Sequence, residues 1–413
     1  MALLRDRRYL VLFLIVFVNF LGGTIVLPML PLYAQRHFEA SPEQISMLLA
    51  AYFAAQFLAA PVLGRLSDKF GRLPVLLYSQ IGTVLSFFMM AVAQDFAVLL
   101  LARVLDGVTG GNVIVAQAYV SDITPKEKRT QGLGIIFMAF GLGYIFGPAL
   151  GGLVAAIGND RLPFFIGAIV TVATVLLTWF LLDESLPKAK RLERKVQGRA
   201  TMKPSEIFGN RSLLIILLIG FCAQFSIAVL QSTIALYAEE ELFRGAGEQT
   251  INLGVGLMLT CIGIGQFITQ IALLRPALRR FGERRLIVIG DILRATGMLS
   301  VILFDSPVLV GAFSLILIAL GSGLMMPSLQ ALATTSGREE ISGGVLGVYN
   351  ASTSLGLIFG TALGGALFSS GHQVPFWVGG VMLLLTALPA IYLMHRTEGD
   401  LAVVEGAPVV GRA

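Results

Sequence analysis

The sequence predicts an all-α polytopic membrane protein with twelve transmembrane helices in two six-helix halves, related by a pseudo-two-fold axis around a central cavity. Three observations lead to this fold class. Of the 413 residues, 56% are hydrophobic and 13% are charged, whereas roughly a quarter of an ordinary soluble protein is charged. Apolar windows long enough to cross a membrane recur about twelve times, and the second half of the chain partly repeats the first.

Each window is predicted to be a helix, because it is apolar all round and has the roughly 20 residues needed to cross about 30 Å of hydrocarbon. A β-barrel would need shorter segments that alternate apolar and polar residues. In the first half the windows are Tyr9–Tyr33, Gln44–Leu63, Pro74–Ala93, Phe96–Val120, Gln131–Ile157 and Leu162–Leu182. In the second half they are Ser212–Tyr237, Ile251–Leu274, Leu286–Phe304, Pro307–Met326, Gly343–Phe368 and Val374–Met394. The first window is too long for a secretory signal and has no small-residue cleavage site, so we expect it to remain as a helix.

The lysines and arginines predict the orientation, since short basic loops stay in the cytoplasm. They gather before the first helix and in the links after even-numbered helices, at Arg5, Arg7, Arg8, Arg65, Lys69, Arg72, Lys126, Lys128, Arg129, Arg275, Arg279, Arg280, Arg284 and Arg285. The opposite links carry only Arg36, Arg161 and Arg244. We therefore expect a multi-pass protein of the cell membrane with both termini cytoplasmic. The net charge of +5 then reflects topology, and we expect no nucleic-acid partner.

One long basic link divides the chain. We predict an N-terminal half at 1–182, a cytoplasmic linker at 183–211, a C-terminal half at 212–396 and a short cytoplasmic tail at 397–413. The linker is either a solvated segment with lipid headgroup contacts or a regulatory element.

Two stretches repeat between the halves. Gly143–Gly152 is echoed by Gly356–Gly365, 213 residues later, and Lys69–Arg72 is matched by Arg280–Glu283, 211 residues later. Two six-helix halves related by such a parallel repeat are typical of transporters that expose a midplane site alternately to the two sides.

Several motifs resemble one family. Gly64–Arg72 resembles the signature between helices two and three of the major facilitator superfamily, with Leu73 in place of the usual second basic residue. Arg103–Gly111 resembles the helix-four motif of that family, and Gly143–Gly152 resembles its antiporter motif. The stretch Leu27–Tyr33 is similar to twelve-helix drug/proton antiporters of the tetracycline-efflux type. The resemblance covers nearly the whole chain up to about Arg396. It implies a secondary active transporter, not an enzyme, that exports lipophilic small molecules in exchange for protons.

The chain departs from such antiporters in helix one, where Asn19 stands at a position that often holds an acid. Another carboxylate must then carry the proton. Asp106 lies about ten residues into helix four, hence about 15 Å deep, and Arg103 is one turn away. Burial disfavours the charged carboxylate while a guanidinium favours it, so entry of substrate or water can switch its protonation. The alternative is a static ion pair.

Asp291 and Arg294 in helix nine have the same spacing. We expect Asp291 to lie about 8 Å from the cytoplasmic end, where snorkelling can solvate it. A structural pair is therefore predicted there, with Asp291 as the second candidate for the coupling acid.

The resemblance also implies a latch on the cytoplasmic side, in which Asp68 faces the start of helix eleven at Gly343–Gly344 and Arg72 reaches Asp122. A helix N-terminus carries about half a positive charge, so it would stabilise Asp68 only while the halves are closed on that side. The alternative is a solvated turn. The residues assigned to the latch are Gly64, Asp68, Lys69, Gly71, Arg72 and Asp122.

A glycine face in helix five is predicted to form a hinge at the seam between the halves, because small residues allow close helix contact and Pro148 permits a bend. Helix eleven repeats the face with Thr361 in place of proline and is expected to be straighter. Ordinary packing without gating is the alternative. The hinge residues are Gly143, Gly147, Pro148, Gly151, Gly152, Gly356, Gly360 and Gly364.

Neutral polar and soft side chains at mid-depth are candidates for the substrate cavity, although each alone is typical of interhelical contacts. They are Asn19, Gln56, Asn112, Gln224, Gln231, Met325, Met326 and Asn350. Abundant Phe, Met and Gln with few buried charges favour a lipophilic substrate, with a cationic one compatible.

No cofactor or metal is expected, because no His, Cys or carboxylate cluster has ligand spacing. We expect a monomer whose partners are the substrate, protons and membrane lipids. Two other functions stay open: a lipid or lysolipid flippase on the same fold, and a non-transporting membrane receptor or scaffold.

Overall fold

The computed structural model describes residues 6–110, 112–125, 129–157, 159–186, 207, 209–335 and 342–395, and these residues contain helices but no strands. Within them, eleven helical stretches are long and apolar enough to cross a membrane. The longest, Glu248–Leu303, has 56 residues and would extend roughly 84 Å as one helix, far more than one crossing needs. Non-helical backbone at Gly282 (φ 73°) interrupts it. It therefore supplies two crossings, and the predicted twelve-helix fold class is confirmed.

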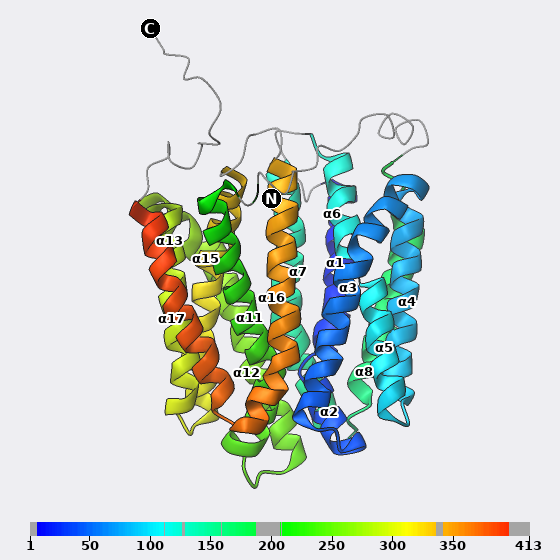
Figure 1. The fold of residues 1–413 in the computed structure, drawn as a ribbon. Coiled ribbons are helices and arrows are strands. Elements are labelled where there is room, and N and C mark those ends of the chain that lie inside the picture. Colours follow the sequence, from blue (N-terminus) through cyan, green and yellow to red (C-terminus); the bar gives the residue numbers. More distant parts are fainter. Residues whose placement is uncertain are drawn as a thin grey trace.

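The helices stand side by side in one bundle (Figure 1). The N-terminal half contains α1 (Arg7–Val26), α2 (Met29–Phe38), α3 (Pro42–Phe70), α4 (Arg72–Val92), α5 (Phe96–Thr109), α6 (Asn112–Ile123), α7 (Arg129–Ala156) and α8 (Leu162–Leu181). The C-terminal half contains α11 (Arg211–Tyr237), η3 (Ala238–Leu242), α12 (Glu248–Ile268), η4 (Thr269–Leu273), α13 (Leu274–Ser300), η5 (Val301–Leu303), α14 (Pro307–Leu309), η6 (Val310–Leu315), α15 (Ile316–Thr335), α16 (Ser342–Ser370) and α17 (Val374–His395). We call the end where α1 begins and α17 ends the terminal end, and the opposite end the far end.

Three predicted spans differ in detail from the observed helices. The first is divided into α1 and α2 around Pro28, which has no N–H to continue the hydrogen-bond ladder. The fourth is divided into α5 and α6 next to Gly110. The tenth continues through α15 to Thr335, beyond its predicted end at Met326.

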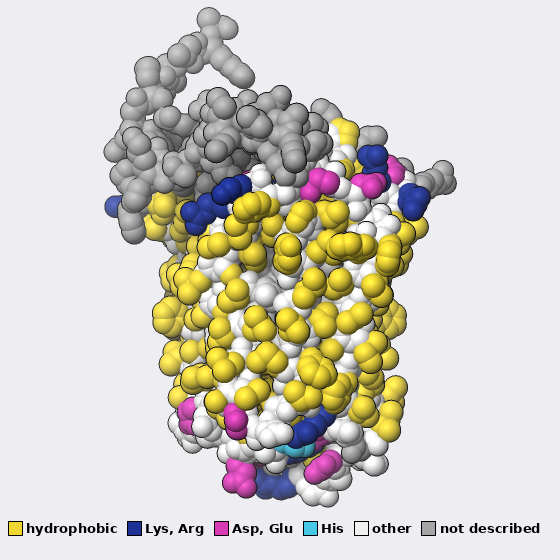
Figure 2. All heavy atoms as spheres, turned by 90° about the vertical axis from the view of Figure 1, so that its right-hand side faces the viewer, with side chains coloured by type: hydrophobic (Ala, Val, Ile, Leu, Met, Phe, Trp, Pro, Cys, Tyr) yellow, Lys and Arg dark blue, Asp and Glu magenta, His cyan; other side chains and the backbone are white. Residues whose placement is uncertain are grey.

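The outer surface matches a membrane environment. Apolar side chains cover the middle of the bundle, and charged side chains gather toward its two ends (Figure 2). Many large apolar side chains are exposed, such as Leu58 at 71% and Phe180 at 73%. In water such a surface would be an aggregation liability, whereas in lipid it is the expected outer face.

Among the described residues, the buried core that both halves share lies at the far end. The largest apolar cluster includes Tyr33 and Phe164 of the N-terminal half with Tyr237 and Phe368 of the C-terminal half, and all four lie near the far end. A second cluster contains buried residues only from the N-terminal half, and a third only from the C-terminal half. The halves are therefore packed together at the far end and have separate cores at the terminal end.

The predicted hinge glycines mostly contact their own half, which corrects the expectation that this face forms the seam. A Cβ on Gly147 would collide with Thr24 of α1, and one on Gly151 would collide with the carbonyl of Ile25. In helix eleven, α16, the same applies to Gly356 and Gly360, which lie against the carbonyls of Phe221 and Phe225 in α11. Gly143 likewise faces Phe20, and Gly364 faces Ser232.

The seams between the halves are α7 against α12 and α3 against α16. The last glycine of each motif belongs to them. A Cβ on Gly152 would meet the Cα of Gly256 at 2.9 Å, and one on Gly365 would collide with the carbonyl of Pro42. Only glycine allows this approach, so Gly152 and Gly365 hold the seam role predicted for the whole face.

Candidate functional site

Arg103 and Asp106 form the predicted ion pair. Arg103 Nη1 lies 2.7 Å from Asp106 Oδ2, and each residue is only 6% exposed. The guanidinium lies over the ring of Tyr52, 4.3 Å from its centroid. The cation thus has a carboxylate on one side and an aromatic face on another, which lowers the cost of burying it.

The helix carrying this pair breaks one turn later, a feature that the sequence analysis missed. Backbone carbonyls at the end of α5 accept hydrogen bonds from side chains of two other helices. Ser79 of α4 donates to the carbonyl of Thr109, and Gln56 Nε2 of α3 donates to the carbonyl of Gly110 at 3.1 Å. Discontinuous helices in membranes require such partners and often surround the ligands of transporters. The consecutive glycines at 110 and 111 were the available signal.

Asp291 and Arg294 are not the solvated structural pair that was predicted. Asp291 is 0% exposed and Arg294 is 1% exposed. Asp291 Oδ2 accepts a hydrogen bond from Thr386 at 2.9 Å, while Arg294 donates to the carbonyl of Ala223. Because each side chain has a different partner, the one-turn spacing does not lead to an ion pair between Asp291 and Arg294.

The remaining cavity candidates have different environments. Gln56 contacts the hydroxyl of Tyr52 at 3.2 Å. Met325 is fully buried in the core of its own half, whereas Asn350 is exposed. The side chain of Asn112 lies outside the described residues. The half-buried candidates are Asn19, Gln56, Gln224, Gln231 and Met326.

An aromatic group adjoins Asn19 and was also missed. The ring of Phe20 lies 4.7 Å from that of Phe140 and 5.2 Å from that of Tyr144, and all three side chains are half-buried. Aromatic residues at helical spacing are common in any core, so the sequence alone did not distinguish them. Partly exposed aromatic faces at mid-depth suit an apolar ligand.

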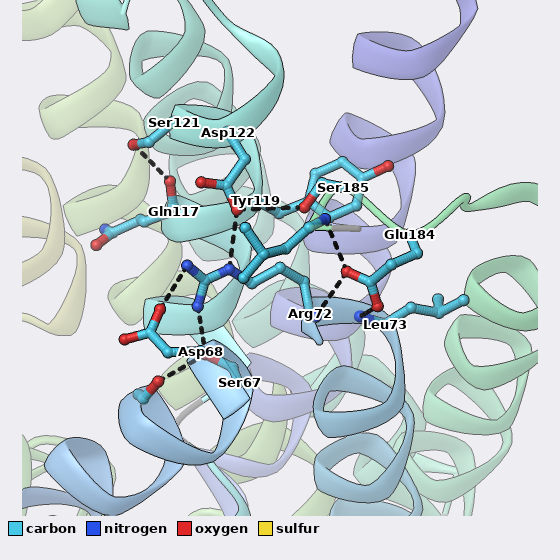
Figure 3. Close-up of polar contacts among 12 residues, drawn as sticks. Ser67, Asp68, Arg72, Leu73, Gln117, Tyr119, Ser121, Asp122, Glu184 and Ser185 are labelled. Carbon is cyan, nitrogen blue, oxygen red and sulfur yellow. Dashed lines mark hydrogen bonds and ion pairs between the residues drawn. The ribbon is translucent and has the colours of Figure 1, made fainter. Parts of the chain in front are cut away.

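At the terminal end, Arg72 is the centre of a polar cluster (Figure 3). Its side chain is 3% exposed and lies 2.8 Å from Asp68 Oδ1 and 2.9 Å from Asp122 Oδ2. It also donates to Ser67 Oγ at 2.6 Å. The expected contact between Arg72 and Asp122 is therefore present, and it joins the start of α4 to the end of α6 within one half.

The start of the linker completes this cluster. Glu184 accepts hydrogen bonds from the backbone N–H groups of Arg72 at 2.9 Å and Leu73 at 3.2 Å. Ser185 Oγ donates to Asp122 Oδ2 at 3.4 Å. A carboxylate at the first N–H groups of a helix is favoured by unpaired donors and by the helix dipole. Leu73 thus contributes its backbone N–H at the position where the resemblance implied a second basic residue.

The predicted contact of Asp68 with Gly343–Gly344 stays a prediction. Gly343 is among the residues whose side-chain environment lies outside the described part, and the two halves have separate cores at this end. The latch was expected only in a state closed at the terminal end.

A second polar cluster lies at the far end and was not predicted. Arg36 of α2 donates from Nε and Nη2 to Glu239 Oε1 of η3, at 3.0 Å and 2.8 Å. Its Nη1 lies 2.9 Å from Asn252 Oδ1 and 3.4 Å from Asp160 Oδ2. Asn252 Nδ2 donates in turn to Asp160 Oδ1 at 3.1 Å. We call these four residues the far-end network. Its members are separated by up to 216 residues in the chain, so no local pattern could reveal it.

Comparisons with known proteins agree with the geometry. A family model described as "Major Facilitator Superfamily" matches residues 12–251 and 244–411. The chain is 32% identical over 377 residues to the class C tetracycline resistance protein of Escherichia coli, covering 90% of this chain and 92% of that protein. It is 28% identical over 389 residues to multidrug resistance protein 2 of Bacillus subtilis (strain 168), covering 91% and 92%.

Solved structures share the fold. The human organic anion transporter MFSD10 (TETRAN) superposes with a TM-score of 0.69 at 23% identity, covering 93% of this chain and 99% of that one. A D-xylose–proton symporter superposes with a TM-score of 0.74 at 16% identity, covering 92% and 96%.

Proposed function

Because the chain belongs to the major facilitator superfamily, we propose that it is a secondary active transporter that works by alternating access and exports lipophilic small molecules in exchange for protons. The printed names of two relatives, a tetracycline resistance protein and a multidrug resistance protein, support drug export as the activity. We place the terminal end in the cytoplasm, since the basic loops lie at that end.

The observation that carries this proposal is the unequal packing of the two ends. One apolar cluster spans both halves at the far end, while each half has its own cluster at the terminal end. A carrier that exposes one site alternately needs states of this kind, with one end closed at a time. This arrangement corresponds to the state open toward the cytoplasm.

Asp106 is the proposed proton carrier and Arg103 its counterion. In the state with the pair formed, the carboxylate has released its proton and the guanidinium neutralises it. Protonation of Asp106 from the other side of the membrane would remove its negative charge and release Arg103 from the ion pair. One proton is therefore carried each time the pair breaks and forms again. The broken helix next to Asp106 supports this role, because the local backbone can adjust without losing the rest of α5.

The apolar substrate fits the aromatic side chains of α1 and α7. Phe20, Phe140 and Tyr144 present aromatic faces, and Gln231 supplies a neutral polar group on the opposite half. A sugar phosphate would require several buried cations. Neutral or singly charged lipophilic molecules match this environment better.

Transport into everted membrane vesicles tests the function. With an acid lumen, the wild-type protein should accumulate tetracycline or ethidium, and a protonophore should abolish the accumulation. Asp106→Asn should lose accumulation but keep exchange of labelled for unlabelled drug, because the amide preserves size and hydrogen bonding. Asp305→Asn, a change at an exposed acid, is the matched control and should behave as wild type.

Two outcomes would overturn the proposal. Movement of fluorescent lipids without drug accumulation would favour a flippase. Recovery of proton-driven drug accumulation in the double variant Arg103→Gln/Asp106→Asn would show that the pair is only structural. Asp291 would then be the candidate for the coupling acid.

A further inference from the structure

The far-end network joins the two halves of the molecule through partly buried charges. Arg36 and Asp160 belong to the N-terminal half, whereas Glu239 and Asn252 belong to the C-terminal half. The side chains of Arg36, Asp160 and Glu239 are only 13%, 11% and 19% exposed. Charged hydrogen bonds of this length are stronger when water is largely excluded. Separating the halves at this end would therefore take Arg36 away from Glu239 and leave Asp160 as its remaining anionic partner.

The network also rests on the closest backbone contact of the α7/α12 seam. Asn252, which bonds both Arg36 and Asp160, begins the stretch of α12 that meets Gly152. A Cβ on Gly152 would lie 2.5 Å from the carbonyl of Asn252. Because Asn252 belongs to both features, the seam cannot open at this end while the network stays intact.

The element that carries Glu239 is built to face both halves. It is the π-helical turn η3, whose wider winding is rare and interrupts α11 after Tyr237. Glu239 binds Arg36, and Glu240 accepts from Gln35 at 3.3 Å, both in the N-terminal half. On the other side, His372 of the C-terminal half lies 3.0 Å from Glu240 and 2.7 Å from Glu241. His372 thus holds the acidic turn from its own half while Arg36 holds it from the other.

We propose that the far-end network is the gate that closes the exit side of the carrier, and that Arg36 is the residue that positions it. The proposal rests on the alternating access proposed above. Release of substrate at the far end requires α2 to leave η3 and α7 to leave α12, and both movements break contacts of Arg36 or Asn252. The strength of these contacts then sets how much of the protein is open at each end.

The test measures accessibility of single cysteines in a background with Cys222→Ala and Cys261→Ala. Ser46→Cys reports the far end, because Ser46 is 0% exposed and lies 3.6 Å from the Cβ position of Gly364 on the α3/α16 seam. Asn350→Cys reports the terminal end, where Asn350 is exposed. Each is labelled with a membrane-impermeant maleimide in right-side-out and everted vesicles, without substrate or a pH gradient.

Arg36→Gln should increase far-end labelling of Ser46→Cys and decrease terminal-end labelling of Asn350→Cys, each at least about fivefold, the lower range of a typical coupling. Glu239→Gln should do the same, and the exchange Arg36→Glu/Glu239→Arg should return labelling toward the parent. Arg244→Gln is the matched control, since Arg244 is an arginine near the same acidic turn with 74% of its side chain exposed. It should label as the parent.

Parent-like labelling in both Arg36→Gln and Glu239→Gln would overturn the gate. Glu239→Gln keeps its size and serves if Arg36→Gln fails to fold, as judged by size-exclusion chromatography. The labelling needs neither drug nor protons, so it separates the two proposals. Failure of drug accumulation with altered labelling would reject the transport activity alone, and normal drug accumulation with unaltered labelling would reject the gate alone.

Discussion

The two ends of the molecule use arginine-centred clusters in different ways. At the far end, Arg36 connects to Glu239 and Asn252 across the two halves. At the terminal end, Arg72 connects Asp68 and Asp122 within one half, and the start of the linker closes the cluster. An ion pair across a seam opposes opening, whereas an ion pair inside a half stabilises that half in every state. Where a cluster lies relative to the seam therefore decides whether it is a gate or a brace.

The same distinction applies to the repeated loops. Gly71 and Gly282 both have positive φ and extended ψ, at 108° and 163° for Gly71 and 73° and 165° for Gly282. The backbone turn is thus conserved between the halves of this chain, but its chemistry is not. Arg72 is buried and paired, whereas its counterpart is Glu283 in a segment rich in arginine. In the first copy, a buried arginine braces the helices of one half.

The largest effect should come from removing the brace. Arg72→Ala leaves Asp122, which is 4% exposed, with one less cation in a buried site, and loss of such a partner typically costs about 3–5 kcal/mol. We expect an early thermal transition in detergent, measured by intrinsic fluorescence or light scattering, and loss of transport. Arg65→Ala, a change at an exposed arginine in α3, should melt as wild type. A stable Arg72→Ala protein with shifted cysteine labelling would make this cluster a gate instead.

Glycine substitutions separate packing inside a half from packing at the seam. Gly147→Leu should abolish transport while the chain still inserts into the membrane, because the added side chain collides with Thr24 of α1 and overpacking costs about 1–3 kcal/mol. Vesicle flotation and drug accumulation measure the two effects. Normal accumulation would show that α1 and α7 need not approach closely.

Gly152→Ala should instead shift the protein toward the state open at the far end, since the new Cβ meets the Asn252 carbonyl and Gly256 only while the seam is closed. Labelling of Ser46→Cys should rise several-fold, in the range of about 5-fold seen for modest couplings. Gly23→Ala, with no atom within 4 Å of the added carbon, is the control. Unchanged labelling would mean that α12 can move aside without opening the seam.

The sequence predicted features that depend on neighbours in the chain. The spans follow from runs of apolar residues, and the Arg103–Asp106 pair follows from one turn of helix. The contact of Arg72 with Asp122 came from the family resemblance. The far-end network could not be predicted, because its members come from three separate helical elements and the link between α7 and α8.

The errors have the same origin. A glycine face shows which residues share a side of a helix but not which helix covers it, so three glycines of α7 were assigned to the wrong neighbour. Counting residues from Leu286 placed Asp291 near solvent. In the structure, Asp291 is covered by Thr386 of α17, which is 95 residues away in the chain.

The latch at the terminal end should have a smaller effect than the brace. Asp68→Asn removes the charge that a helix N-terminus would stabilise in the state closed at this end, an interaction of about 0.3–2 kcal/mol. Terminal-end labelling of Asn350→Cys should therefore rise moderately and far-end labelling of Ser46→Cys should fall. Arg65→Gln, which changes an exposed charge one turn earlier in α3 without touching the acid, serves as the control. Equal labelling of Asp68→Asn and the parent on both sides would reject the latch.

The smallest effect is expected at His372, which contacts the acidic turn from within the C-terminal half. Its side chain is 40% exposed, and exposed ion pairs contribute only about 0–1 kcal/mol. His372→Gln keeps a donor for Glu240 or Glu241, so labelling of Ser46→Cys should change by no more than about twofold, well below the effect of Arg36→Gln. The reason is that His372 moves with η3 when the halves separate, whereas Arg36 stays behind on α2. If His372→Gln and Arg36→Gln gave equal shifts, the acidic turn itself, and not its bond across the seam, would control the far end.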